Sequence, residues 1–220
     1  MSFPVQRVTA NQHGRDFVVG DVHGCFSKLS AELDGLQFNP DIDRLFSVGD
    51  MVDRGPESVD VTDWLDRPWF YAVRGNHEQF ALDYLAGIID ADDLQECGGG
   101  WFLELNHARR AEIAARFNAL PIAIEVDTPS GVVGIVHADC PFDSWDEMVA
   151  ELCSDESFTF ASVCLFSRER ITANDARGVR NIDRVFVGHT PVMAPMSLGN
   201  VHYIDTGAVF RGALTVVRIN

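Results

Sequence analysis

Short apolar segments and amphipathic segments alternate through the first ninety residues. The apolar segments DFVVG, RLFSVG and WFYAV occupy residues 16–20, 44–49 and 69–73. Their length and their bulky apolar residues predict buried β-strands. The intervening segments are predicted to be helical, because apolar residues recur at helical spacing from Phe26 to Leu36 and because residues 58–65 and 77–85 have helical character. Alternating strands and helices are typical of a parallel α/β sheet.

The pattern changes after residue 90. The segment QECGGGWF predicts a flexible turn at residues 95–102, which opens a helical region that extends to about residue 118. Two apolar strands at 121–126 and 132–136 flank the turn sequence DTPSG, so they predict a hairpin. A helix near 143–153 and three further strands follow; the strands are expected at 184–188, 201–205 and 213–219. Alternating strands and helices in the first part of the chain, followed by hairpins in the second part, indicate a mixed α/β (α+β) fold with two sheets.

Length and composition restrict the class of protein. The 220 residues predict a single domain spanning 1–220, with a helical insertion around 85–118. A net charge of −16 argues against a nucleic-acid partner, since such binding needs a basic surface. No apolar run reaches the ~20 residues of a membrane span, and the first residues lack the apolar stretch of a signal peptide. We therefore expect a soluble, cytoplasmic protein without a membrane partner.

The cysteines do not suggest a disulfide framework or a structural zinc site. Their number is five, and no CxxC pair occurs. An odd count without a secretory signal predicts reduced thiols. Cys140 follows the segment HAD directly and is expected either as a buried, inert thiol or as an oxidation-sensitive thiol near a cleft.

Three sequence blocks place polar residues at the end of a predicted strand. GDVHG occupies residues 20–24, GDMVDRG residues 49–55 and RGNHE residues 74–78. The later segments VHAD and VGHT add His137 and His189 after two more apolar strands. A single Asp or Asn in such a position is commonly a turn former or a helix cap. Five successive strand ends with acid, amide and imidazole groups instead indicate one shared site, because strand carboxyl ends converge on a crevice.

These side chains suit divalent metal ions. Carboxylates, imidazoles and an amide oxygen without a thiolate are ligands for Mn, Fe or Zn. There are too many such groups for one tetrahedral site, so they predict two ions about 3.5–4 Å apart that share a carboxylate, an arrangement used for phosphoryl transfer. Neighbouring arginines, Arg54 and Arg74, are suited to neutralise phosphate oxygens.

The blocks GDVHG, GDMVDRG and RGNHE together resemble the signature of the metallophosphoesterases, in the phosphoprotein phosphatase branch. The resemblance is greatest to the group typified by the bacteriophage lambda protein phosphatase and its bacterial relatives. It continues through GGGWF, HADCPFD, SRERI, VGHTP and YIDTGAVF, so it covers nearly the whole chain. It implies the calcineurin-like metallophosphoesterase fold, a two-sheet β-sandwich flanked by helices.

The resemblance also implies a role for each matching residue. The implied metal ligands are Asp21 and His23 for the first ion, Asp50 as the bridge, and Asn76, His137 and His189 for the second ion. His77 would be the general acid, with its ring oriented by Asp53. Arg54, Arg74 and Arg168 would hold the phosphate, and Arg170 would be the less favoured clamp. Asp205 is expected as a turn residue that supports the site.

The implied activity is that of a metal-dependent serine/threonine protein phosphatase. A hydroxide bridging two divalent ions, expected to be Mn²⁺ with Fe or Zn as alternatives, would attack phosphorus in line, and phosphoproteins or phosphopeptides would be the substrates. The enzymatic alternative is a bis(5'-nucleosyl)-tetraphosphatase-like hydrolase, a group that shares GDVHG but typically reads GDLVARGP where this chain has GDMVDRGP. Asp53 therefore favours the protein phosphatase. A phosphopeptide-binding pseudoenzyme and a metal-stabilised scaffold are the non-enzymatic hypotheses, although every matching position is filled.

Overall fold

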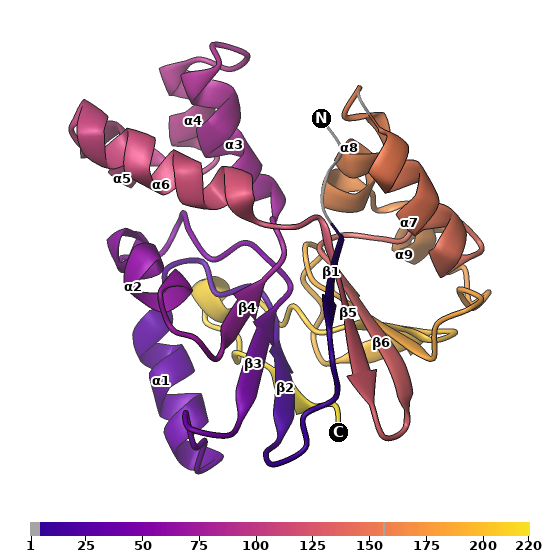
Figure 1. Cartoon of the computed structure of the whole chain (residues 1–220). Coiled ribbons are helices and arrows are strands. Elements are labelled where there is room, and N and C mark those ends of the chain that lie inside the picture. Colours follow the sequence, from indigo (N-terminus) through magenta and orange to yellow (C-terminus); the bar gives the residue numbers. More distant parts are fainter. Residues whose placement is uncertain (1–4, 156) are drawn as a thin grey trace.

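Two β-sheets form the centre of the molecule, and helices cover the outer face of each sheet (Figure 1). The computed structural model describes residues 5–155 and 157–220, so residues 1–4 and 156 of the predicted domain lie outside the described part. Mixed α/β composition and the two-sheet arrangement confirm the fold class predicted from the sequence.

The smaller sheet carries the first three polar blocks. Its strand order is β10-β2-β3-β4. The strands are β2 (Asp16–Val19), β3 (Arg44–Ser47), β4 (Phe70–Ala72) and β10 (Val216–Arg218). β2, β3 and β4 are parallel, whereas β10 is antiparallel to β2. The carboxyl ends of the three parallel strands therefore lie along one edge of the sheet.

The larger sheet has the order β1-β5-β6-β7-β9-β8. Its strands are β1 (Val5–Val8), β5 (Ala123–Thr128), β6 (Gly131–Val136), β7 (Arg184–Val187), β8 (Met196–Leu198) and β9 (Val201–Tyr203). β5 and β6 form the predicted antiparallel hairpin, and β6 pairs in parallel with β7. His137 and His189 follow β6 and β7, so both histidines come from the same end of neighbouring strands.

Alternation along the strands explains why the sheets pack face to face. In β2, Phe17 and Val19 pack against the outer helices while Val18 packs between the sheets. Strands of the larger sheet also contribute to this inner layer, for example through Ile124 and Ile135. The central strands β2, β3 and β7 thus bury side chains on both faces, as expected where a sheet is covered on both sides.

The helices form two outer layers (Figure 1). Those over the smaller sheet are α1 (Phe26–Gly35), α2 (Val61–Leu65), α3 (Asn76–Leu85), α4 (Ala91–Glu96), α5 (Gly100–Glu104) and α6 (His107–Ala119). Those over the larger sheet are α7 (Trp145–Ser154), α8 (Thr159–Phe166) and α9 (Glu169–Ala173). Two 3₁₀ turns, η1 (Ser58–Asp60) and η2 (Ala208–Phe210), complete the described elements. Among the described residues, no helix is long and apolar enough to cross a membrane.

Some elements differ from the sequence expectation. The predicted helical region that ends near 118 consists of three helices, because the glycines at 98–100 and Asn106 interrupt it. β1 was not predicted, since its exposed Gln6 and Arg7 give little apolar signal. α8 was not predicted either, because its sequence TFASVCLF is apolar on all sides and lacks a helical period.

Candidate metal centre

Five strand ends bring the candidate side chains together. Asp21 and His23 follow β2, Asp50 follows β3, and Asn76 begins α3 after β4. His137 and His189 follow β6 and β7, so the two sheets contribute opposite parts of one buried cluster.

Several of these residues have an unusual backbone conformation. The φ angles of His23, Asp50 and His189 are 43°, 49° and 65°, in a region that non-glycine residues rarely adopt. Such conformations cost free energy and cluster at functional sites. Here they turn the side chains at the strand ends toward a common point.

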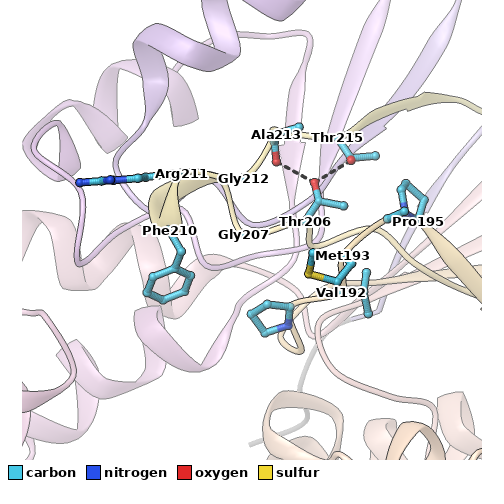
Figure 2. A pocket seen from close by; sticks show the side chains of 12 residues that line it. Val192, Met193, Pro195, Thr206, Gly207, Phe210, Arg211, Gly212, Ala213 and Thr215 are labelled. Atoms are coloured by element: carbon cyan, nitrogen blue, oxygen red, sulfur yellow. Dashed lines mark hydrogen bonds between the residues drawn. The ribbon is translucent and has the colours of Figure 1, made fainter.

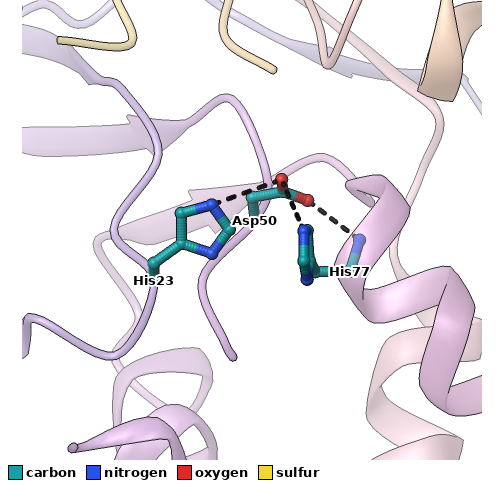
Figure 3. Close-up of side chains that lie close together, drawn as sticks. All are labelled: His23, Asp50 and His77. Carbon is teal, nitrogen blue, oxygen red and sulfur yellow. Dashed lines mark hydrogen bonds and ion pairs between the residues drawn. The ribbon is translucent and has the colours of Figure 1, made fainter. Parts of the chain in front are cut away.

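Asp50 lies at the centre of the cluster, between His23 and His77 (Figure 3). One carboxylate oxygen, Oδ2, lies 3.7 Å from His23 Nε2 and 3.9 Å from His77 Nε2. The other, Oδ1, lies 3.3 Å from His137 Nε2 and accepts a hydrogen bond from the backbone N–H of His77. Burial alone would raise the pKa of Asp50, but the facing His137 and His77 hold it well below its usual range. An ionised carboxylate therefore faces imidazoles on two sides.

Main-chain carbonyls orient three imidazoles. Nδ1 of His23 lies 2.8 Å from the carbonyl oxygen of Val52, and Nδ1 of His137 lies 2.7 Å from that of Val48. Nε2 of His189 lies 3.2 Å from the carbonyl oxygen of Phe166. Because a carbonyl only accepts, each of these nitrogens carries the proton, and the opposite ring nitrogen is left as an acceptor that faces the cluster.

Three acceptors converge next to Asp50. Asn76 Oδ1 lies 2.8 Å from His137 Nε2 and 2.9 Å from His189 Nδ1. When both imidazoles are neutral, in the tautomers set by the carbonyls, none of these three atoms is a donor, so a cation would satisfy them together. Burial lowers the pKa of His189 to about 3, which keeps it neutral and able to bind a metal. Burial alone would lower the pKa of His137, but the charge of Asp50 outweighs burial and raises this pKa above its usual value. Such a rise is expected where a site favours a positive charge.

A second group of acids lies beside His23. Asp21 accepts hydrogen bonds from the backbone N–H of His189 at 3.0 and 3.2 Å to its two carboxylate oxygens. Burial, and then the charges of Asp205 and Asp50, raise the pKa of Asp21 well above its usual range. Burial chiefly lowers the pKa of His23 to about 3, so its imidazole is neutral. Crowded carboxylates beside a neutral imidazole are a donor set that a divalent cation would stabilise.

Two glycines allow the carboxylates to approach the backbone. A Cβ atom on Gly188 would lie 1.9 Å from Asp21 Oδ1, and one on Gly75 would lie 2.2 Å from Asp50 Oδ1. Any larger residue at these positions would displace a candidate ligand, so the glycines of VGHT and RGNHE have a steric function.

His77 forms a buried relay with two other side chains. Its Nδ1 donates to Asp53 Oδ2 at 2.8 Å, and Trp101 Nε1 donates to the other carboxylate oxygen, Oδ1, at 2.6 Å. The sequence identified His77 and Asp53 but not Trp101. The only signal for Trp101 was its position in GGGWF, and an indole N–H has no charge that would mark it as a site residue.

Two arginines lie next to the cluster. Nη1 of Arg54 donates to His23 Nε2 at 2.5 Å, and its side chain is otherwise exposed. Arg168 is also exposed, and its charge contributes to the lowered pKa of His189 after burial and the charge effects of His137 and Asp50. Both are accessible to an anion at the mouth of the site.

Two other arginines are held inside the protein. Arg74 is 2% exposed and donates to the carbonyl oxygens of Phe117, Asn118 and Leu120 and to the Gln79 side chain. In this geometry the Arg74 guanidinium ties α6 to α3, and its expected contact with phosphate stays a prediction. Arg170 donates to Asp139 at 2.9 Å and to the carbonyl oxygens of Arg177 and Cys140.

Glu78 is a further residue whose role the sequence did not reveal. It is fully buried, and its carboxylate accepts backbone hydrogen bonds from Asp50, Met51 and Gly75 at 2.8–2.9 Å. Burial and the charge of Asp50 raise its pKa to about 7. Glu78 thus fastens the loop after β3 to the start of α3 and sets the spacing between Asp50 and Asn76.

Asp205 borders the cluster, and the other remaining candidates lie outside it. Burial raises the pKa of Cys140 to about 12, so the thiolate needed for oxidation is disfavoured. Asp205 is buried and accepts from the backbone N–H of Gly207, as a turn residue does. His13 and His107 are exposed, and His202 stacks on the ring of Phe186.

Comparisons with known proteins agree with this geometry. Residues 17–193 match the family described as calcineurin-like phosphoesterases. The chain is 41% identical over 219 residues to serine/threonine-protein phosphatase 1 of Salmonella typhimurium, covering 97% of this chain and 96% of that protein. It is also 32% identical over 155 residues to the symmetrical bis(5'-nucleosyl)-tetraphosphatase of Erwinia tasmaniensis, covering 64% of this chain and 49% of that protein.

A solved structure supports the fold. The crystal structure of a protein provisionally named a diadenosine tetraphosphatase superposes with a TM-score of 0.68 and covers 98% of both chains. The two sequences are 24% identical, so this similarity concerns the architecture alone.

Proposed function

This chain belongs to the calcineurin-like metallophosphoesterases, in the phosphoprotein phosphatase branch, and on that premise we propose that it is a serine/threonine protein phosphatase. The observation that carries the proposal is the contact of 2.8 Å between His77 and Asp53, in the block where the tetraphosphatases typically have Ala instead of Asp. A proton donor held in this way is what a poor leaving group such as serine requires.

The proposed metal centre uses the converging acceptors described above. Asp21 and His23 would hold one divalent ion, and Asn76, His137 and His189 would hold the other. Asp50 lies close to both His23 and His137 and would contribute to each ion. Mixed oxygen and nitrogen ligands favour Mn²⁺, with Fe and Zn as alternatives. The bound ions would supply a water molecule that ionises near neutral pH and charge that offsets the phosphate.

The side chains of the protein perform the remaining steps. Arg54 and Arg168 hold phosphate oxygens at the mouth of the site, where both guanidinium groups are exposed. His77 keeps one proton on Nδ1, directed at Asp53, and holds a second at Nε2, which faces the site on the side of Asp50. That second proton goes to the departing serine oxygen, and Asp53 stabilises the imidazolium before transfer.

The choice of a phosphoprotein substrate rests on the degree of similarity. The protein phosphatase relative is 41% identical to this chain, whereas the tetraphosphatase relative is 32% identical. We also propose that residues 1–220 form one domain and that the helical insertion around 85–118 borders the site, since Trp101 reaches Asp53 from it. A cytoplasmic location fits phosphoprotein substrates of this kind.

A substrate panel tests the proposal. The manganese-loaded protein is assayed on phosphoserine, phosphothreonine and phosphotyrosine peptides, nitrophenyl phosphate and diadenosine tetraphosphate. Phosphoserine or phosphothreonine peptides should have the highest kcat/KM. Faster turnover of diadenosine tetraphosphate would replace the proposal by its tetraphosphatase alternative. Binding of phosphopeptides without hydrolysis of any compound would favour the pseudoenzyme.

A further inference from the structure

An apolar groove of about 520 Å³ lies between two loops of the chain (Figure 2). One wall is the segment 191–195, which follows His189, and the other is the loop 206–215. Met193 is fully exposed at 103%, and Phe210 is 61% exposed on the opposite wall. Large apolar side chains exposed on both walls of one groove indicate a binding surface, because isolated proteins usually bury such groups.

The loop that forms the second wall is held rigidly. Thr206 Oγ1 donates to the carbonyl oxygen of Ala213 at 2.6 Å, and the backbone N–H groups of Phe210 and Gly212 both donate to the carbonyl oxygen of Gly207. A Cβ atom on Gly212 would lie 1.9 Å from the backbone oxygen of Thr206, so the turn is as tight as a glycine permits. A preformed groove loses little conformational entropy when it binds a partner.

The groove is continuous with the site. The Arg54 guanidinium lies over the Phe210 ring at 5.5 Å and also contacts His23. On the other wall, the backbone N–H of Val192 donates to the carbonyl oxygen of Asp205, whose carboxylate lies near Asp21. A phosphate held by Arg54 would therefore have its attached chain at the entrance of the groove.

The lining favours an aliphatic side chain over a nucleobase. Pro191, Val192, Met193 and Pro195 offer no side-chain hydrogen-bonding groups. The Thr206 hydroxyl is engaged by Ala213 and lies 2.8 Å from the Thr215 hydroxyl. A base would lose hydrogen bonds to water along its edge, and the exposed Arg211 is the charged donor of the lining that could replace one of them, whereas an apolar side chain loses none.

We propose that this groove binds an apolar side chain that flanks the phosphorylated residue of a phosphoprotein substrate. The inference rests on the proposed phosphatase function and adds a sequence preference to it. Arg54 joins the two parts, because its Nη1 contacts His23 in the site and its guanidinium lies over the Phe210 ring of the groove.

Matched phosphopeptides test the groove. The host is an alanine-rich peptide with one phosphoserine, in which Leu replaces Ala at one flanking position at a time. For the wild-type protein, kcat/KM should rise about 10-fold at the position that enters the groove, the size expected for half burial of three added carbons. Met193→Ser and Phe210→Ser should each remove most of this preference through KM. Ile88→Ser, at an exposed apolar residue away from the groove, is the matched control and should retain it.

The outcomes separate the two proposals. Hydrolysis of all peptides at equal kcat/KM, or a preference for Leu that survives in both groove variants, would overturn the groove proposal and leave the phosphatase function intact. Failure to hydrolyse any phosphopeptide, with nitrophenyl phosphate still hydrolysed, would overturn both proposals. If Met193→Ser instead raised KM for diadenosine tetraphosphate alone, the occupant would be a nucleobase and the groove proposal would be wrong.

Discussion

Replacing Trp101 by Phe should separate proton donation from the other parts of catalysis. The substitution keeps an aromatic ring against Phe102 but removes the N–H group that donates to Asp53 at 2.6 Å. Asp53 then keeps its hydrogen bond to His77 but loses the donor that fixes its other carboxylate oxygen, so the carboxylate orients the imidazole less well for proton transfer. A leaving group that needs a proton will be affected, and one that leaves as a stable anion will not.

The size of the effect follows from the geometry. A hydrogen bond to a charged group contributes about 1.5–3 kcal/mol. Since ~1.4 kcal/mol is a factor of ten in rate, loss of the whole bond gives an upper range of about 10–150-fold. The bond from His77 to Asp53 remains in the variant, so we expect the lower end, about 10-fold, on phosphoserine peptides. His77→Asn removes the acid itself and should cost about 10²–10⁴-fold, with Asp53→Asn between the two.

The assay compares kcat/KM for a phosphoserine peptide with that for nitrophenyl phosphate in each variant. The ratio of the two should fall about 10-fold in Trp101→Phe, with nitrophenyl phosphate changing less than about twofold. Trp69→Phe is a matched control, because Trp69 is also partly buried and packs against Phe38 and Trp64. Metal content should be unchanged in all variants. An equal loss on both substrates, with metals retained, would refute the relay.

Three further predictions concern the metals and the arginines. Asp50→Asn should lower the content of both metal ions in elemental analysis, whereas substitution of a ligand confined to one group should lower the content of one ion. Full activity of a protein that contains a single ion would contradict the shared carboxylate. Arg54→Ala should weaken inhibition by inorganic phosphate roughly 10-fold without lowering the melting temperature, and unchanged inhibition would exclude it as a clamp. Arg74→Ala should instead destabilise the fold by about 3 kcal/mol in denaturant unfolding, because three carbonyls lose their donor; native stability would contradict its structural assignment.

The strand ends could be predicted because their chemistry depends on local sequence. Gly-Asp or Asn-His soon after an apolar segment indicates that these polar residues lie at the carboxyl end of a strand. Parallel strands bring their carboxyl ends together at one edge of the sheet. For this reason the local sequence was sufficient to place Asp21, Asp50, Asn76 and His137 in one cluster. The alternation of apolar residues likewise predicted the two sheets.

The surroundings of the cluster depend on contacts between distant segments, which leave no periodic signal. Arg74 is expected to contact phosphate because it lies in RGNHE, and nothing in the local sequence indicates its carbonyl partners more than forty residues away. The hydrogen bond from Trp101 to Asp53 likewise joins two residues that are 48 positions apart in the sequence. The role of Glu78 was hidden for a different reason, since its partners are backbone N–H groups, which nearly every residue type provides.

The division of the ligands between the two sheets has a consequence for protein synthesis. Asp21 and His189, which hold opposite parts of the centre, are separated by 168 positions in the chain. At a translation rate of about 5–20 residues per second, His189 is made roughly 10–30 s after Asp21. During that interval a nascent chain has the carboxylates of the first three strands but lacks the imidazole that completes the second group. With the proposed ligands, the chain must therefore be synthesised at least as far as His189 before it could bind both ions.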